Sequence, residues 1–248
     1  MNNKPLQFKE IYAEVRESFL RKGPYSTSIS EKIGDIFAYY MTPAFLNAGL
    51  SANKTTALSL FICFLAACFT IIPGGWTTGL LIYALAVVLD HVDGRIARAT
   101  NTQSYFGLFW DALVDALKTS IMRAAFVWVI YVQTSFSPLF WVSFTCLMLT
   151  PFYVFLHDRY SSFTRCINEQ QEPQLKPYIR HDVLLKPASV IEEIDRLSLL
   201  FSIVWFGPAL WIYFTLNLIL QLFFIGQHLY SAFKNMRVYY AREDLKTA

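Results

Sequence analysis

The chain has 248 residues, of which 55% are hydrophobic, 17% are aromatic and only 16% are charged. Because a soluble domain usually carries about 25% charged residues, this composition excludes an ordinary soluble protein and indicates an integral membrane protein. The net charge of +3 says little by itself, and we expect no nucleic-acid partner.

Residues 1–50 are expected to form a cytoplasmic arm and an interfacial helix. The first ~20 residues are polar and charged, so we expect no cleaved signal peptide. Residues 8–20 carry apolar side chains at helical spacing, which predicts a short amphipathic helix. That helix either binds the membrane surface or packs, solvated, on the rest of the chain. Residues 33–50 are interrupted by Pro43 and Gly49, so we interpret them as a helix lying along the bilayer.

Four apolar stretches of roughly 20 residues follow, which is the length needed to cross about 30 Å of hydrocarbon. The predicted spans are residues 53–72, 76–90, 106–133 and 139–157. The helix of the second span is expected to continue to about Ala99. Pro151 is expected to kink the fourth span.

The remaining chain divides into a polar part, an apolar part and a basic end. Residues 158–196 are polar and predict a cytoplasmic loop that leads into a helix. Residues 197–233 are too long for one crossing and suit two, with the break at Gly207–Pro208 or at residues 215–217. Residues 234–248 form a basic cytoplasmic tail.

Together these elements predict an all-α integral membrane protein. Residues 51–233 would be a bundle of six transmembrane helices, preceded by the N-terminal interfacial amphipathic helix. Strongly basic loops then all fall on one side, which the positive-inside rule assigns to the cytoplasm. We therefore expect a multi-pass protein of the inner (cytoplasmic) membrane with both termini in the cytoplasm.

Four carboxylates lie between the second and third predicted spans, at the cytoplasmic mouth of the bundle. Asp90 and Asp93 are three residues apart, and Asp111 and Asp115 are four apart, so each pair shares one helix face. Ionised groups are expensive beside lipid and are by default functional candidates. If the two helices are antiparallel neighbours, all four acids converge on one pocket with the oxygen ligands of a hard-metal site.

Three functions compete for this acid cluster. One is an ion-pair network with Arg95, Arg98 and Lys118, although such buried networks seldom add stability. A second is a cation-transport site. The position of all four acids at one membrane face argues against transport. The third is metal-dependent phosphoryl transfer, in which two divalent ions roughly 3.5–4 Å apart hold a diphosphate.

The pattern D-x-x-D-G-x-x-A-R, eight residues, then G-x-x-x-D-x-x-x-D runs through residues 90–115. It matches in full the signature of the CDP-alcohol phosphotransferase (CDP-alcohol phosphatidyltransferase) family, which the chain therefore resembles. The resemblance implies a membrane enzyme of phospholipid biosynthesis that transfers a substituted phosphate, usually phosphatidyl, to an acceptor alcohol and releases CMP. The usual donor is CDP-diacylglycerol, and the implied cofactor is Mg²⁺ or Mn²⁺, as two ions.

The resemblance also implies roles for individual residues. Asp90, Asp93 and Asp111 would be metal ligands, and Asp115 would be the general base and also touch the second metal. The implied nucleotide-binding residues are Gly94, Ala97, Arg98, Gly107, Asn53 and Thr56. Of these, the small residues would make room for the cytidine nucleotide, or alternatively for helix packing. Asn53 and Thr56 belong to a Pro-Asn-x-x-Thr element in which Ala52 replaces the proline.

The acceptor is a small alcohol or polyol whose identity the motif leaves open. Lys118, Arg123 and Arg159 are candidates for binding an acceptor phosphate, or alternatively are interfacial or paired charges. The lipid bilayer and a second copy of the chain, as a homodimer, are further possible partners. A membrane cation transporter or an inactive member of the same fold is the alternative function.

Overall fold

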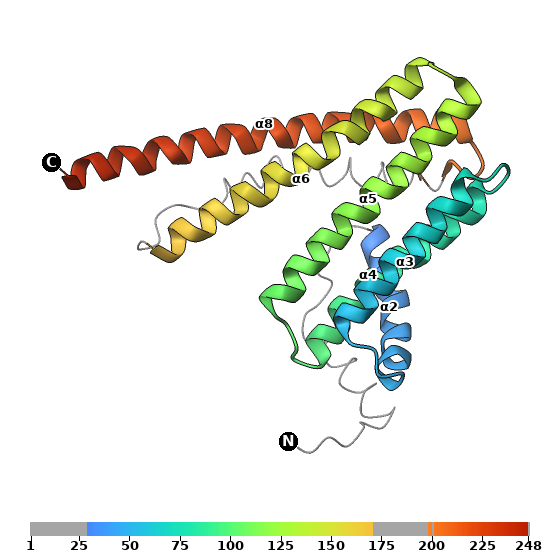
Figure 1. Ribbon diagram of the computed structural model, residues 1–248, viewed down its shortest axis with the longest axis horizontal. Coiled ribbons are helices and arrows are strands. Elements are labelled where there is room, and N and C mark those ends of the chain that lie inside the picture. The colour runs from blue at the N-terminus through green and yellow to red at the C-terminus, as the bar shows by residue number, and fades with distance from the viewer. Residues whose placement is uncertain (1–28, 171–197, 200, 248) are drawn as a thin grey trace.

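The computed structural model describes residues 29–170, 198–199 and 201–247, which form helices and short turns without a β-strand (Figure 1). The predicted all-α class is confirmed. The helices are α2 (Ile29–Asn47), α3 (Ala52–Ile71), α4 (Trp76–Ala99), α5 (Tyr105–Thr134), α6 (Pro138–Gln170) and α8 (Phe206–Thr247). The predicted amphipathic helix at residues 8–20 lies outside the described residues.

Local signals explain where the helices around the acid motif begin. The Ser51 hydroxyl caps α3 by accepting a hydrogen bond from the Lys54 amide. The Ser104 hydroxyl caps α5 in the same way by accepting from the Gly107 amide at 3.0 Å. Between α4 and α5 the chain reverses in five residues, with Asn101 at a φ of 51°, a left-handed conformation that asparagine tolerates well. Helix α3 packs against both α4 and α5 and so holds together the two helices that this short turn connects.

Helices α3, α4 and α5 pack into one layer that carries the acid motif, while α2 covers α4. Helix α6 packs against both α5 and α8, and α6 and α8 run side by side (Figure 1). At the end away from the motif, Phe126 of α5 packs on Trp76 of α4, with ring centroids 5.1 Å apart, and on Tyr213 of α8. The largest core cluster therefore holds the far ends of these helices together and leaves the motif end more open.

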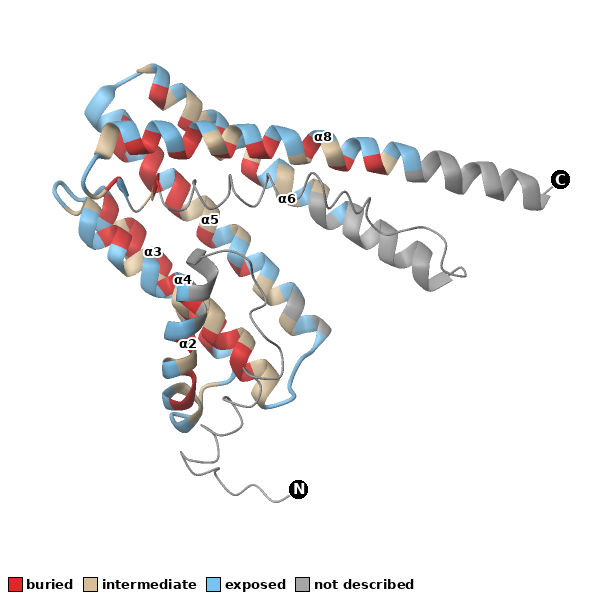
Figure 2. Cartoon of the chain, turned by 180° about the vertical axis from the view of Figure 1, so that it is seen from behind, coloured by how far each residue is buried: buried red, intermediate tan, exposed pale blue. Residues whose placement is uncertain are grey.

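Within the described residues, three helical segments are long and apolar enough to cross a membrane: Ala52–Ile71, Pro138–Leu156 and Phe206–Lys234. Helices α4 and α5 have 24 and 30 residues, also enough for a crossing, but they carry the acids and the neighbouring basic residues. Large apolar side chains such as Phe61, Leu81 and Trp128 are exposed on the outer faces, and buried residues line the inner faces (Figure 2). An apolar exterior of this kind suits contact with lipid.

The predicted division of residues 197–233 into two crossings is not confirmed. Residues 198, 199 and 201 are helical, residues 202–205 form a turn, and helix α8 then begins at Phe206 and continues without a break. The chain therefore turns just before the predicted break at Gly207–Pro208. Gly207 and Pro208 lie in the first turn of α8, where proline is tolerated, whereas residues 215–217 are inside the helix. The expected total of six spans is not confirmed.

Two further boundaries differ from the sequence analysis. Helix α6 passes the predicted end near His157 and continues to Gln170, so residues 158–170 are helical and do not begin a loop. The basic tail is also helical, because α8 extends to Thr247. In contrast, the predicted ends of the second and third spans agree with α4 and α5 to within about one residue.

Candidate metal centre

Three of the four motif acids converge in the structure. Asp90 and Asp93 in the last turns of α4 and Asp111 in the second turn of α5 each place a carboxylate oxygen within 4.8 Å of the others. We call these three residues the three-acid group. Val92 and Ile96, on the opposite face of α4, pack against Ala38 of α2, which fixes the rotation of α4 and so directs its acids toward α5.

The donor set of the three-acid group fits a hard divalent cation. All three ligands are carboxylates, the type preferred by Mg²⁺ and Mn²⁺ over softer metals. An ion bound at about 2.1 Å by each oxygen needs those oxygens within roughly 4.2 Å of one another, so a small rotation of the side chains closes the group around it. Asp93 and Asp111 form no ion pair within the described part of the chain, so cations of the protein do not satisfy the whole cluster.

Helix α3 contributes a hydroxyl to this group. The Thr56 hydroxyl donates a 2.5 Å hydrogen bond to Oδ2 of Asp93, whose side chain is buried. This bond fixes one oxygen of Asp93 and leaves the other for a ligand. The structure thus brings Thr56, one of the predicted nucleotide-side residues, into direct contact with the acids.

The fourth acid, Asp115, is not a member of the three-acid group. Its Oδ1 accepts a hydrogen bond from the Lys118 ammonium at 2.8 Å, and Lys118 also donates to Oδ1 of Asp90. The side chain of Lys118 is 6% exposed, whereas that of Asp115 is 51% exposed. Among the residues that the structure describes, the ion-pair alternative is thus seen at Lys118, whose ammonium lies between two of the acids.

Two motif glycines make room for neighbouring polar groups. A Cβ atom at Gly94 would lie 3.3 Å from Nη1 of Arg98, so the guanidinium folds back over this glycine. A Cβ atom at Gly107 would lie 3.2 Å from the capping hydroxyl of Ser104 and 3.5 Å from Oδ1 of Asn53. The other predicted nucleotide-side residue, Ala97, is half-buried on α4 near these groups. The two glycines thus leave room for the polar side chains of Arg98, Ser104 and Asn53.

The three predicted acceptor-site cations are not brought together. Only Lys118 contacts the acids. Arg123 is buried two turns further along α5, where its guanidinium donates to Thr150 of α6 and to Asn217 of α8. Arg159 is exposed, and its guanidinium lies 5.4 Å from the ring centroid of Phe155.

Sequence reasoning missed the two contacts that place these cations. The spacing of Lys118 three residues after Asp115 is a signal for that ion pair, but nothing local predicts the pairing with Asp90, 28 residues away. Thr150 and Asn217 are polar residues inside apolar stretches, which in membrane helices commonly hydrogen-bond across a helix interface. That signal was available for the surroundings of Arg123.

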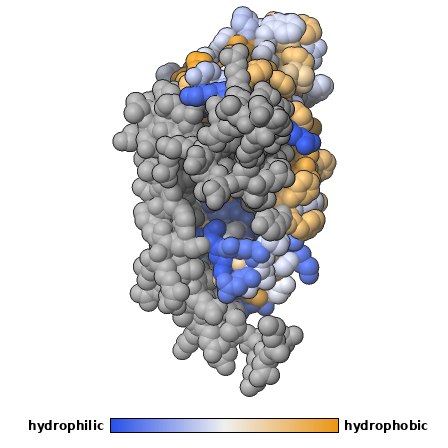
Figure 3. Space-filling model, turned by 90° about the vertical axis from the view of Figure 1, so that its left-hand side faces the viewer, coloured by the Kyte–Doolittle hydropathy of each residue, from blue (hydrophilic) through white to orange (hydrophobic). Residues whose placement is uncertain are grey.

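The site also lies at a polar end of the molecule. The turn between α4 and α5 is at the lower end in Figure 1. A side view shows hydrophilic residues gathered toward that lower end and hydrophobic residues above them (Figure 3). The turn beside the acid motif thus lies at the end where hydrophilic residues gather in this view.

The fold and site define a helical membrane protein with an acidic centre formed by residues of two successive helices. The chain belongs to the CDP-alcohol phosphatidyltransferase family, whose family model matches residues 49–172, about half of its length. It is 30% identical over 77 residues to the CDP-diacylglycerol–serine O-phosphatidyltransferases of two strains of Helicobacter pylori. These matches cover 31% of this chain and 30% of each relative.

A solved structure shares the fold over a larger part of the chain. The crystal structure of phosphatidylinositol phosphate synthase from Mycobacterium tuberculosis, in apo form, superposes with a TM-score of 0.54. The alignment covers 78% of this chain and 94% of that one, at 18% sequence identity. The likeness confirms the predicted fold family.

Proposed function

We propose that the protein is a metal-dependent CDP-alcohol phosphatidyltransferase of phospholipid biosynthesis. It transfers a phosphatidyl group from CDP-diacylglycerol to the hydroxyl of a small alcohol and releases CMP. The observation that carries this proposal is the three-acid group with Thr56 bonded to Asp93, formed within the complete family signature. A transporter is less well supported, because the acids lie at one end of α4 and α5 and do not follow the length of the bundle.

The divalent cation, Mg²⁺ or Mn²⁺, would be held by Asp90, Asp93 and Asp111. A second ion would be contacted by Asp115. When bound, the ions neutralise the diphosphate and the charge that develops on CMP. Arg98 binds the diphosphate through its guanidinium. The remaining nucleotide-side contacts come from Asn53, Thr56, Gly94, Ala97 and Gly107.

Asp115 is the general base of the proposed reaction. Its carboxylate is half-exposed, so an acceptor hydroxyl can approach within hydrogen-bond distance. The acceptor oxygen forms a bond to the phosphorus that carries the diacylglycerol, the bond from that phosphorus to the CMP oxygen breaks, and the hydroxyl proton passes to Asp115. Atoms and charge balance with CMP as the leaving group.

The acceptor alcohol is chosen by residues beyond the motif. Arg123 and Arg159 remain the proposed contacts for an acceptor phosphate, together with Lys118, which contacts Asp90 and Asp115. Candidates are serine, glycerol phosphate, and inositol or its phosphate. The proposed setting is the inner membrane, with both termini and the acid motif in the cytoplasm, which is supported by the positions of the basic residues. A homodimer is the proposed assembly.

The decisive experiment measures CMP release by the purified protein in detergent micelles. CDP-diacylglycerol is supplied with each candidate alcohol and with Mg²⁺ or Mn²⁺. We expect CMP release with one of the alcohols, its loss on chelation of divalent ions, and its recovery when metal is restored. Absence of CMP release from the wild-type protein with every acceptor would contradict the proposed function.

The variant Asp115→Asn tests the base. It should lower turnover at least about a hundredfold, the lower range of general-base contributions, while the midpoint of thermal unfolding in detergent stays near the wild-type value. The retained midpoint is the internal control for folding. Turnover near the wild-type rate in this variant would rule out Asp115 as the base.

A further inference from the structure

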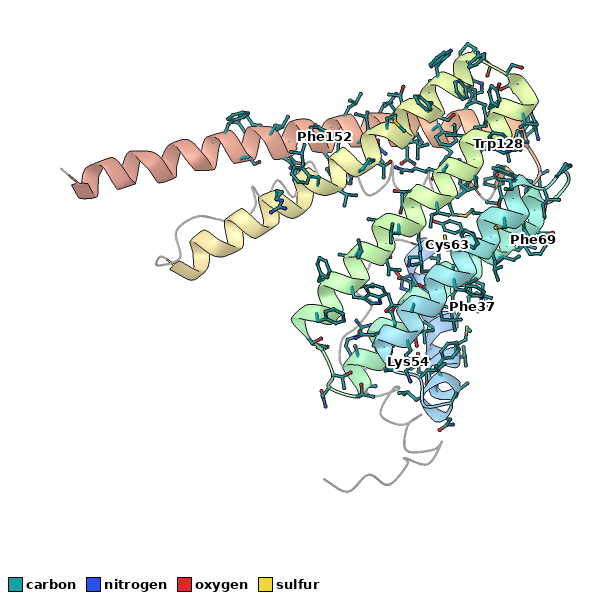
Figure 4. All side chains as sticks on the ribbon, viewed as in Figure 1. Phe37, Lys54, Cys63, Phe69, Trp128 and Phe152 are labelled. Atoms are coloured by element: carbon teal, nitrogen blue, oxygen red, sulfur yellow. The ribbon has the colours of Figure 1, made fainter. Side chains whose placement is uncertain are left out.

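Lys118 is a buried cation at the edge of the proposed metal centre. Its ammonium donates to carboxylates on two helices, Asp90 of α4 and Asp115 of its own helix α5. Helix α3 packs beside it, with Sγ of Cys63 lying 3.6 Å from the Lys118 carbonyl (Cys63 is labelled in Figure 4). The ammonium therefore occupies a fixed position between the two acids.

Asp90 belongs both to the three-acid group and to the Lys118 ion pair. Oδ1 of Asp90 accepts from Lys118, and a carboxylate has further lone pairs, so Asp90 can serve a cation held with Asp93 and Asp111 while the ion pair persists. Asp115 is different, because it lies outside the three-acid group and its contact in the site is Lys118. A second cation that bridges Asp90 and Asp115 would have to take the place of the ammonium.

We propose that Lys118 is a resident counter-ion at the second metal position, so that the two divalent ions bind with unequal affinity. The first ion binds the three-acid group with Lys118 in place. The second ion binds only when the ammonium leaves Asp90 and Asp115. This inference rests on the proposed metal-dependent function and adds an order of binding to it.

The charge and the burial of Lys118 both weaken binding of the second ion. An ammonium within about 4 Å of a second cation opposes its binding by more than a factor of ten at the effective dielectric of a partly buried site. The displaced ammonium also loses two carboxylate partners while its side chain is 6% exposed, so little solvent is available to replace them. The first ion avoids both costs because it does not displace Lys118.

The test is a titration of the metal-free, purified protein with Mn²⁺, followed by electron paramagnetic resonance. Spectra distinguish free Mn²⁺, a single bound ion and a spin-coupled pair. For the wild-type protein we expect isolated bound Mn²⁺ up to one equivalent, and spin-coupled pairs only as a second equivalent binds at least about tenfold more weakly. Coupled pairs that dominate below one equivalent would overturn the inference.

Variants at Lys118 separate the charge from the rest of the side chain. Lys118→Met removes the ammonium and keeps an unbranched apolar side chain, and should strengthen the second binding event at least about tenfold and the first by less. Lys118→Arg keeps a cation and should leave the second event weak. Lys234→Met, an exposed lysine at the far end of the candidate span in α8, controls for loss of charge alone and should change neither event.

The outcomes distinguish this inference from the function on which it rests. If the wild-type protein releases CMP in a metal-dependent manner but the two affinities differ equally in wild type and Lys118→Met, the inference about Lys118 is wrong and the function stands. If the wild-type protein binds no Mn²⁺ and CMP release ignores chelation, both are wrong. Should Lys118→Met fail to fold, the wild-type titration alone decides the question.

Discussion

At the residue scale, the contact between Thr56 and Asp93 joins a helix outside the acid motif to the site. Both side chains are almost fully buried, and the hydroxyl hydrogen can serve either Asp93 or the Ala52 carbonyl of its own helix, 3.0 Å away. Groups that hydrogen-bond to metal ligands orient those ligands, and their removal typically lowers metal affinity 10- to 100-fold. Thr56 is therefore a positioning residue as well as a nucleotide-side candidate.

The variant Thr56→Val should weaken binding of the first Mn²⁺ by roughly 10- to 100-fold, because Asp93 loses the donor that orients it. The measurement is the Mn²⁺ titration described above. Thr55→Val is a closely matched control, since Thr55 is equally buried but donates to Ser51 of its own helix at 3.1 Å and touches none of the acids. Equal Mn²⁺ affinity in the two variants would show that the Thr56 bond has no orienting role.

Residues of the motif could be predicted from the sequence because helical spacing places them on shared faces. The convergence of Asp90, Asp93 and Asp111 follows from two helix faces and one short turn. The separate position of Asp115 could not be predicted, because it depends on where the Lys118 ammonium reaches across to the neighbouring helix. Long flexible side chains take positions that only the packed neighbours decide.

At the scale of elements, the position of α4 depends on glycines that allow close contact. A Cβ atom at Gly34 of α2 would lie 2.7 Å from the ring of His91, so α2 approaches α4 closely beside the acids. A Cβ atom at Gly79 of α4 would lie 2.1 Å from Oγ1 of Thr70 and 2.7 Å from its backbone nitrogen in α3. Close backbone approach at small residues is a common basis of helix packing in membranes.

Substituting Gly79→Ala should destabilise the protein by about 1–3 kcal/mol, because the added methyl forces α3 and α4 apart. For a chain of this size the midpoint of thermal unfolding in detergent should fall by roughly 2–10 °C. Gly226→Ala in α8 is the control, since a Cβ atom there has no neighbour within 4 Å, and its midpoint should stay the same or rise. A Gly79→Ala midpoint equal to that of the wild type would contradict the close approach.

The elements themselves were predictable to different degrees. Helix α4 ends at polar turn residues, and α5 begins at a serine cap. These two bounds therefore follow from local chemistry. The continuity of α8 does not follow from local chemistry, because Asn217 interrupts the apolar pattern. In the structure the side-chain oxygen of Asn217 accepts a hydrogen bond from Arg123. A polar residue within a helix is explained there by a partner 94 positions away.

At the scale of the whole molecule, the ends of α5 fall on opposite sides of the apolar region. With 30 residues at 1.5 Å each, α5 is about 45 Å long, enough to cross the bilayer core and reach both interfaces. The turn before α5 carries the polar end of the site, and the turn after it leads into the apolar stretch of α6. The orientation proposed from the basic residues can therefore be tested at these two turns.

Two glutamines provide a matched pair for that test. Gln103 precedes α5 and Gln133 lies in its last turn, and both are exposed. In a background with the native cysteines replaced, Gln103→Cys should react with a membrane-impermeant thiol reagent only after the cytoplasmic side is opened, whereas Gln133→Cys should react in intact spheroplasts. Labelling in the reverse pattern would invert the topology.

Arg123 has a consequence for how the chain enters the membrane. Its guanidinium lies within a helix expected to cross the bilayer, and the partners that receive its hydrogen bonds are neutral groups of Thr150 and Asn217, 27 and 94 residues further along. During synthesis α5 emerges before either partner exists, so this helix cannot settle in lipid as an independent segment without exposing an unsatisfied cation. Stable integration of α5 must wait for α6 and α8, which couples the biogenesis of the amino-terminal catalytic half to completion of the polypeptide.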